Sequence, residues 1–191
     1  MISFFSLGIG GLIILFLWLF VGSFGLPAGT VTLISFGSLA AGANKLILVI
    51  IISFVAAVLG DILAYELARK LSGRLRDRLR KFSFFRDSEP RAKRLLSKHE
   101  FPIVFFTRFA ILSLCVVISY VSGFERVNRR KFIIAVVSGE ILFATIYSLI
   151  GFGIGEAVGN VLTAANYLIV AILLLFAVFY LARFLLRRRN K

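Results

Sequence analysis

Long apolar runs dominate this chain and predict membrane-spanning helices. Residues 2–21 form an uncharged run rich in Leu and Phe, and residues 46–67 form a second apolar run. Residues 132–182 are long enough for two further apolar helices, divided around residues 151–160. Because a bilayer core requires about 20 apolar residues per helix, we expect four spanning helices.

Two further apolar segments do not fit a single crossing. Residues 30–43 are uncharged but short and rich in Gly, Ser and Thr. Residues 101–124 are long enough to cross, but basic clusters flank both ends, so a hairpin that enters and leaves on one side fits better. Such backbone is tolerated at membrane depth only where it is buried in protein or lines a water-filled cavity. We therefore expect residues 1–191 to form one all-α integral membrane domain with four spans and two re-entrant helical hairpins.

Positive charge is concentrated in three clusters that predict the orientation. Residues 69–100 contain twelve Lys or Arg residues against four Asp or Glu residues. Two smaller basic clusters follow at residues 126–131 and 183–191. By the positive-inside rule, all three clusters and both chain termini are expected in the cytoplasm.

An apolar stripe at helical spacing runs through the first basic cluster. It consists of Leu71, Leu75, Leu79 and Phe82. Because basic side chains occupy the opposite positions, the stripe predicts an amphipathic helix on the inner leaflet, in contact with anionic lipid headgroups. An ordinary solvated basic loop is the alternative.

The two halves of the chain share a weak pattern. In each half a glycine is followed 16 to 18 residues later by a glycine and an acid. The members are Gly42 with Gly60-Asp61, and Gly123 with Gly139-Glu140. If the two hairpins enter from opposite sides, the halves form inverted repeats, an architecture of many secondary transporters with a site at the repeat interface.

Composition supports a membrane protein and narrows its partners. The chain has 191 residues, of which 60% are hydrophobic and 17% charged, and a formal net charge of +14. Soluble domains are usually about a quarter charged. In a chain this apolar, a cationic surface more often meets lipid headgroups than nucleic acid. We therefore expect membrane lipids as partners and no nucleic acid; a homo-oligomer is compatible with the sequence.

Three ionisable residues and one tyrosine within the apolar segments are candidate site residues. Arg108 lies in the second hairpin, where its charge costs about 2.5 to 3.5 kcal/mol unless it is paired or reaches water. Its planar guanidinium suits a lipid phosphate. We expect Asp61 and Glu140 to flank a polar cavity into which Arg108 points, with Tyr65 one turn beyond Asp61. The alternatives are a snorkelling Arg108 and a merely local hydrogen bond between Asp61 and Tyr65.

An intramembrane enzyme is not expected, because histidine-dependent hydrolytic chemistry needs a histidine near a buried nucleophile. The single histidine, His99, lies in the basic segment instead. The single cysteine, Cys115, permits no intrachain disulfide, and the sequence shows no metal-ligand cluster, so no cofactor is expected. A lipid transporter, a proton- or ion-coupled small-solute transporter and a structural membrane protein all stay open at this point.

Gly151, Gly155 and Gly159 recur every four residues near the end of the third apolar region. A dinucleotide-binding loop would need a preceding strand, which this region does not predict. The spacing instead predicts a small-residue face for helix packing.

Four strings of the sequence carry a further signal. They are LPAGTVTLISFGSLAAG, GDILAYELARKLSG, FFTRFAILSLCVVISYVSGFERVNRRKF and SGEILFATIYSLIGFGIG. Together, over about residues 24–156, they resemble the DedA, or VTT-domain (SNARE-associated Golgi protein), membrane family. The resemblance implies two opposed re-entrant hairpins and a flippase- or scramblase-like role in moving phospholipids or polyprenyl phosphates between leaflets. It also implies the bacterial plasma membrane as location, and hairpin or packing roles for Pro27, Gly29, Gly60, Gly123 and Gly139.

The chain departs from the family pattern at two places. Members commonly carry an acid just after the proline of the first hairpin, where this chain has Ala28, Gly29 and Thr30. Members also commonly have a proline, and often a second arginine, after the arginine that corresponds to Arg108, whereas residues 110–115 here are uncharged. The resemblance therefore implies the lipid-handling scaffold, without the residues usual for proton coupling.

Overall fold

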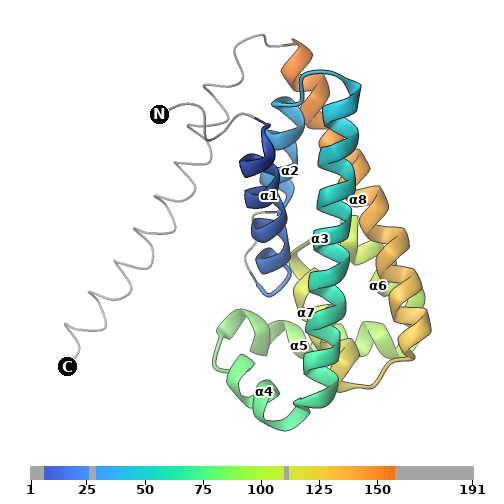
Figure 1. The fold of residues 1–191 in the computed structure, drawn as a ribbon. Helices are drawn as coiled ribbons and strands as arrows, with labels where there is room; N and C mark the ends of the chain where they lie inside the picture. Colours follow the sequence, from blue (N-terminus) through green and yellow to red (C-terminus); the bar gives the residue numbers. More distant parts are fainter. Residues whose placement is uncertain (1–6, 26–28, 110–111, 158–191) are drawn as a thin grey trace, which may run out of the picture.

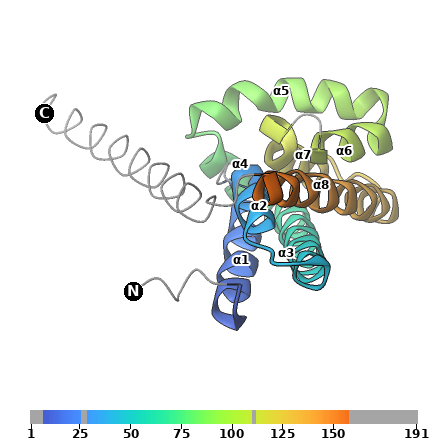
Figure 2. The same cartoon turned by 90° about the horizontal axis from the view of Figure 1, so that it is seen from above.

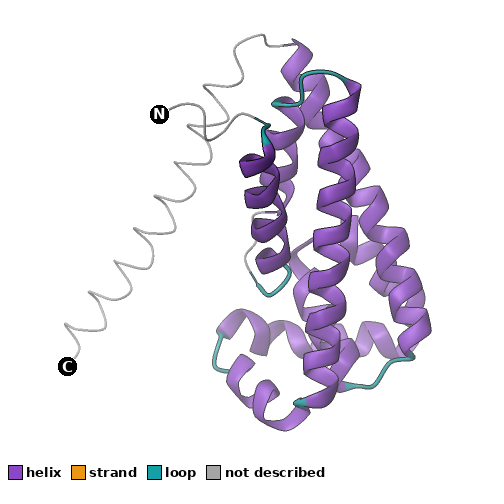
Figure 3. Ribbon diagram, viewed as in Figure 1, coloured by secondary structure: helices purple, strands orange, loops and turns teal. Residues whose placement is uncertain are grey.

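The described part of the chain consists of α-helices joined by short connections. The computed structural model describes residues 7–25, 29–109 and 112–157. In chain order its helices are α1 (Ile9–Gly22), α2 (Gly29–Ser38), α3 (Ala43–Lys70), α4 (Ser72–Leu79), α5 (Ser83–Lys98), α6 (Glu100–Phe109), α7 (Leu112–Phe124) and α8 (Arg129–Ala157). No strand occurs among the described residues, so the expected all-α class is confirmed for this part of the chain (Figure 3).

Two of these helices, α3 and α8, are long and apolar enough to cross a membrane. They have 28 and 29 residues. At 1.5 Å per residue each is about 40 Å long, which exceeds the hydrocarbon thickness of about 30 Å. α1 is apolar but has 14 residues, fewer than the span predicted over residues 2–21. The last predicted span and the basic tail lie outside the described residues.

Two of the short helices, α2 and α7, pack on the long helix from the other half of the chain. α2 lies along α8, and α7 lies along α3, while α6 contacts both α7 and α8. Figure 1 shows α1 and α2 beside one half of the long helices, and α6 and α7 beside the other half. The long helices also contact each other, so they connect the two groups.

The amphipathic helix expected from the apolar stripe at residues 71–82 corresponds to α4, and a second helix, α5, follows it in the basic segment. Leu75 and Leu79 of α4 pack partly buried against the core, but Leu71 and Phe82 at its ends are exposed. α5 lies across α6 and α7 (Figure 2). The chain turns after α4, and α5 buries a face of its own with Phe85, Ala92 and Leu96.

An ion-pair clamp holds α4 against α5. Glu89 of α5 is buried and accepts hydrogen bonds from Arg76 Nε at 2.5 Å and Arg80 Nε at 2.6 Å. Burial alone would raise the pKa of the Glu89 carboxyl, but the hydrogen bonds from Arg80 and Arg76 outweigh it and hold that pKa below its usual range. The hydrogen bond to Glu89 in turn raises the pKa of the Arg80 guanidinium.

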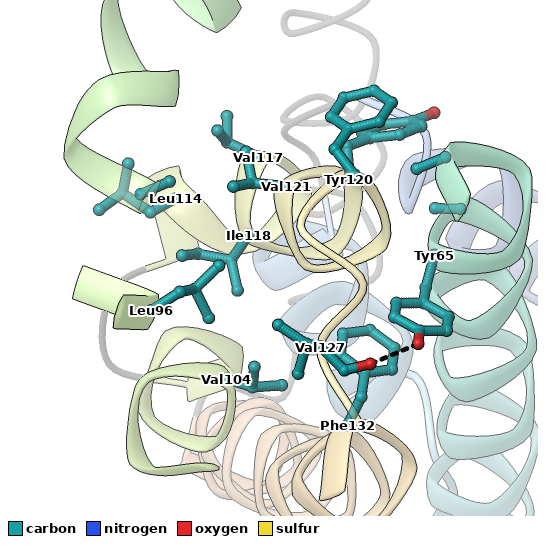
Figure 4. Packing of buried hydrophobic residues seen from close by; sticks show 14 of the residues in the cluster. Tyr65, Leu96, Val104, Leu114, Val117, Ile118, Tyr120, Val121, Val127 and Phe132 are labelled. Carbon is teal, nitrogen blue, oxygen red and sulfur yellow. Dashed lines mark hydrogen bonds between the residues drawn. The ribbon is translucent and has the colours of Figure 1, made fainter. Parts of the chain in front are cut away.

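Two buried apolar clusters form the core. The larger one joins α3, α5, α6, α7 and α8, and Figure 4 shows Val117, Ile118 and Val121 of α7 within it. The smaller one joins α1, α2, α3 and α8. Both α3 and α8 contribute residues to both clusters. On each of these helices a buried acid, Asp61 or Glu140, lies between the residues of one cluster and those of the other.

Candidate functional site

The two buried acids lie where the apolar clusters meet. On α3, Asp61 falls between Ala56 of the smaller cluster and Ala64 of the larger one. On α8, Glu140 lies in the same way between residues 136 and 143. Arg108 comes from the last turn of α6, which packs on α8. The fold therefore brings three ionisable groups, distant in the sequence, to one level of the helix bundle.

Arg108 forms an ion pair with Asp61 inside this bundle. Its NH1 lies 2.6 Å from Asp61 Oδ2, and the two side chains are 0% and 2% exposed. The Oε1 atom of Glu140 is 3.9 Å from the same NH1, close enough for attraction but not for a hydrogen bond. The snorkelling interpretation of Arg108 is therefore wrong. A paired guanidinium avoids most of the cost of an isolated buried charge.

Two residues of α7 complete the cluster, and sequence reasoning assigned neither of them to it. Arg108 NH1 lies 2.9 Å from Cys115 Sγ, and its NH2 donates to Ser119 Oγ at 2.9 Å. Ser119 Oγ also lies 3.0 Å from Asp61 Oδ1. Cys115 and Ser119 are four residues apart and so share one helix face. The sequence signal that could have identified them is a pair of polar residues at helical spacing, seven and eleven residues after an intramembrane arginine.

Arg108 occupies the position that a bound cation would take. The ligand atoms of Asp61, Cys115 and Glu140 lie within 4.8 Å of one another, a spacing that a metal ion could use. The guanidinium already lies among them, at hydrogen-bonding distance from Asp61 and Cys115. A metal ion would have to displace Arg108, so the donor set fits the guanidinium better than a metal.

Some hydrogen-bonding capacity of the cluster is unused. Arg108 Nε and Glu140 Oε2 are buried and have no hydrogen-bond partner among the described residues. Unsatisfied buried polar atoms are uncommon, and each requires an explanation. Two carboxyl groups face this one guanidinium, so with both carboxyls ionised the cluster would carry one negative charge in excess.

Tyr65 does not belong to this cluster. Its hydroxyl donates to the carbonyl of Val127 at 2.7 Å and accepts from Arg69 NH1 at 2.7 Å. Figure 4 shows the first of these bonds joining α3 to the connection before α8. The local Asp61–Tyr65 hydrogen bond considered from the sequence is therefore wrong. Tyr65 also stacks on Phe132 at 4.3 Å between centroids, and Phe132 lies beneath the Arg108 guanidinium at 5.9 Å.

Three of the five hairpin and packing positions are points of close helix approach. A Cβ on Gly139 would lie 2.6 Å from Arg108 Cγ, and one on Gly60 would lie 2.6 Å from Ser23 Oγ. A Cβ on Gly123 would collide with the carbonyl oxygen of Tyr65. At Gly29 a Cβ would meet Phe143 at 3.5 Å, an ordinary contact. Pro27 lies outside the described residues.

The predicted small-residue face on α8 packs against α2. A Cβ on Gly151 would overlap the carbonyl of Ile34, and one on Gly155 would lie 2.5 Å from the carbonyl oxygen of Ser38. On α2, Gly37 meets the carbonyl of Ser148 in the same manner, a position that the sequence pattern did not reveal. Gly159 lies outside the described residues.

Comparison with known families decides which family the chain belongs to. A family model described as the VTT domain matches residues 26–153, about two thirds of the chain. The chain belongs to the DedA/SNARE-associated Golgi protein family. This VTT-domain family is membrane-associated, and with the two apolar helices α3 and α8 the match identifies a membrane protein. No curated protein and no solved structure matches the chain.

Proposed function

We propose that this VTT-domain protein moves phosphate-bearing lipids between the leaflets of its membrane, and that Arg108 binds the lipid phosphate. The observation that carries the proposal is a completely buried arginine with an unpaired Nε, held at the junction of two apolar clusters. Intramembrane charges of this kind commonly mark substrate pathways. The two apolar clusters meet at this position, and repeat-built transporters bind their substrates where their two halves meet.

The proposed binding step is an exchange of the hydrogen-bond acceptors of Arg108. In the closed cluster its NH1 and NH2 donate to Asp61 and Ser119. A guanidinium binds phosphate through two parallel charge-assisted hydrogen bonds, so a lipid phosphate can replace these partners without leaving the arginine uncompensated. Because the cluster is closed in the described structure, α6 and α7 must separate from α3 or α8 before a headgroup can enter.

The displaced acid also requires compensation. Once Arg108 binds a phosphate, Asp61 has lost its cation in an apolar environment, and proton uptake removes the cost of an unpaired buried charge. Glu140, 3.9 Å from Arg108, provides a second carboxyl group that can exchange the proton. We therefore infer transport rather than catalysis. His99, the single histidine, is exposed at the C-terminal end of α5, away from the buried cluster.

A second candidate function is a proton- or ion-coupled transporter of small solutes on the same scaffold. Two carboxyl groups around one guanidinium favour it, because such a cluster can cycle between proton-bound and cation-bound forms. In either case we expect the basic helices α4 and α5 on the cytoplasmic side of a bacterial plasma membrane, by the positive-inside rule. Anionic lipids are the partners expected in that leaflet of the membrane.

The test uses the full chain reconstituted in liposomes that contain a fluorescently labelled phospholipid. A membrane-impermeant reductant bleaches only the outer leaflet, so lipid exchange appears as bleaching beyond half. We expect exchange with the wild type and its loss in Arg108→Gln. Arg91→Gln, which removes an exposed cation of α5, is the matched control and should exchange like the wild type.

A double variant separates function from folding. Asp61→Asn combined with Arg108→Gln removes both charges of the pair, so that neither is left unpaired. If this variant melts near the wild-type temperature and still exchanges lipid, Arg108 is not the phosphate-binding group. The other outcome is that lipid exchange with the wild type does not exceed that of empty liposomes, while the protein carries protons into vesicles loaded with a pH-sensitive dye. In that case the solute-transporter function replaces lipid translocation.

A further inference from the structure

A pocket on the basic end of the bundle is separate from the Arg108 cluster. It is open, has a volume of about 960 Å³, and lies between the C-terminal end of α3 and the N-terminal end of α8. Its charged lining consists of Glu66, Arg69, Lys70, Arg126, Arg129 and Arg130. Five cations against one acid leave four positive charges around one opening.

Most of this charge has no internal partner. Glu66 is occupied by Arg129, whose Nε lies 2.7 Å from its Oε1. Lys70, Arg126 and Arg130 form no ion pair among the described residues. Cations gathered without acids repel one another, so the pocket is electrostatically prepared for an anion.

Glu125 precedes Arg126 in the chain, but its carboxylate pairs with cations of α4 and α5 and not with Arg126. Its Oε2 lies 3.0 Å from Lys93 Nζ on α5, and its Oε1 lies 3.4 Å from Arg76 NH2 on α4. The acid therefore faces the α4–α5 layer. Arg126 therefore lines the pocket without the neighbouring acid Glu125.

The backbone that presents Arg126 is strained. Arg126 has a φ of 54°, and the hydrogen bonds from Val127 N to Ser122 O and from Arg126 N to Gly123 O close α7 with a Schellman turn. Glycine is the usual residue at this left-handed position, and an L residue there costs about 1 kcal/mol or more. A strained arginine at the rim of a cationic pocket suggests a role for its side chain.

Hydrogen bonds hold the backbone at the floor of the pocket. The Tyr65 hydroxyl fixes the carbonyl of Val127 and accepts a hydrogen bond from Arg69. Asn128 caps α8 by accepting from the backbone N–H groups of Arg130 and Lys131 at 3.0 and 3.3 Å. The cationic side chains therefore extend from a backbone that is held in place, which lowers the entropic cost of binding.

We propose that this pocket binds the phosphomonoester headgroup of an anionic lipid. A phosphomonoester carries up to two negative charges and three acceptor oxygens, which suits several converging cations. The pocket lies at the ends of α3 and α8, the two helices long enough to span a membrane, and headgroups are found at that level. Binding here does not require that the protein transports lipid.

The test is calorimetric titration of the detergent-purified full chain with short-chain phosphatidic acid, with short-chain phosphatidylcholine as the zwitterionic comparison without net charge. The pocket variant is Arg126→Asn with Arg130→Gln, since asparagine tolerates the left-handed backbone. Each cation near an anionic headgroup contributes about fivefold in affinity, so we expect the pair to lose about 25-fold. Arg126→Lys with Arg130→Lys should remain within about threefold of the wild type.

The matched control is Arg91→Gln with Arg94→Gln, which removes the same charge from exposed positions on α5 and should leave affinity nearly unchanged. Equal losses in the two double variants would mean general charge attraction and would overturn the proposal. Absence of phosphatidic acid binding would overturn it as well. If inorganic phosphate or glycerol phosphate binds as tightly as the lipid, the pocket is a site for soluble phosphates and the lipid assignment is wrong. Because the readout is binding, none of these results depends on the outcome of the transport assay.

Discussion

Gly139 of α8 lies directly against the side chain of Arg108, where a Cβ would be 2.6 Å from Cγ and 2.8 Å from Cβ of the arginine. It would also be 2.8 Å from the carbonyl oxygen of Phe105, one turn earlier on α6. This glycine lets α6 and α8 approach closely enough for the guanidinium to reach both Asp61 and Glu140. The residue before Glu140 is therefore part of the geometry of the ion cluster.

Gly139→Ala should destabilise the protein by about 1 to 3 kcal/mol, because the added methyl group must displace α6 or bend the arginine. Gly153→Ala on the same helix is the control, since a Cβ there meets nothing within 4 Å. Because alanine has a higher helix propensity than glycine, the free energy of unfolding of the control should stay unchanged or rise by up to about 1 kcal/mol. Thermal unfolding in detergent measures both, and equal midpoints for the two variants would contradict the close approach.

The Arg108–Asp61 pair should show strong coupling in a double-mutant cycle. Arg108→Gln leaves Asp61 as a buried charge without its cation, at a cost of about 3 to 5 kcal/mol, whereas Asp61→Asn leaves Arg108 with Glu140 at 3.9 Å as its remaining carboxyl. Because the double variant removes both charges of the pair, its loss of stability should be smaller than the sum of the two single losses. Chemical unfolding of the four proteins tests this, and additive losses would mean that the two charges do not interact.

The Glu89 clamp should make stability depend on pH. Because hydrogen bonds from Arg76 and Arg80 hold the pKa of Glu89 below its unfolded value, the contribution is complete at neutral pH. It is lost as the pH falls through the folded-state pKa, which lies below the unfolded value of about 4.3.

The free energy of unfolding of the wild type should therefore exceed that of Glu89→Gln by about 1 to 2 kcal/mol at pH 7, and this difference should shrink towards pH 3. Unfolding midpoints measured across that range provide the comparison. Asp87→Asn, which removes an acid from an exposed ion pair with Arg86, should differ little from wild type at any pH. A difference for Glu89→Gln that stays constant into acid would contradict the clamp.

Tyr65→Phe should cost about 1 to 2 kcal/mol, because it leaves the Val127 carbonyl and Arg69 without their partner while keeping the stack on Phe132. It should also weaken phosphatidic acid binding severalfold, since the floor of the basic pocket loosens. Tyr147→Phe is the control, because its hydroxyl donates to Phe109 on the far side of the ion cluster. If Tyr65→Phe binds phosphatidic acid as tightly as the wild type, the Tyr65 hydroxyl does not support lipid binding in the pocket.

The sequence was most informative where physical cost restricts the alternatives. Charged groups within apolar segments have few acceptable surroundings, so Asp61, Arg108 and Glu140 could be grouped before any coordinates were known. Residues 46–67 indicated the long helix α3 because spanning length and hydropathy are local properties. The four-residue glycine spacing at Gly151 and Gly155 indicated a packing face for the same reason.

Other features depended on partners that carry no sequence signal. The hydroxyl of Tyr65 binds a backbone carbonyl 62 residues away, and every residue has a carbonyl. Glu89 resembles the many charges around it, and only the turn between α4 and α5 buries it. The basic pocket likewise exists because Glu125 points to α4 and α5, away from its neighbour Arg126.

The sequence by itself therefore determined the helical class, the membrane environment and which buried charges had to find partners, since these follow from local hydropathy and from the cost of burying charge. The tertiary structure alone decided which atoms meet. Whether Asp61 binds Arg108 or Tyr65 depends on how α3, α6 and α8 are placed by packing between residues far apart in the chain, and no local pattern encodes that placement.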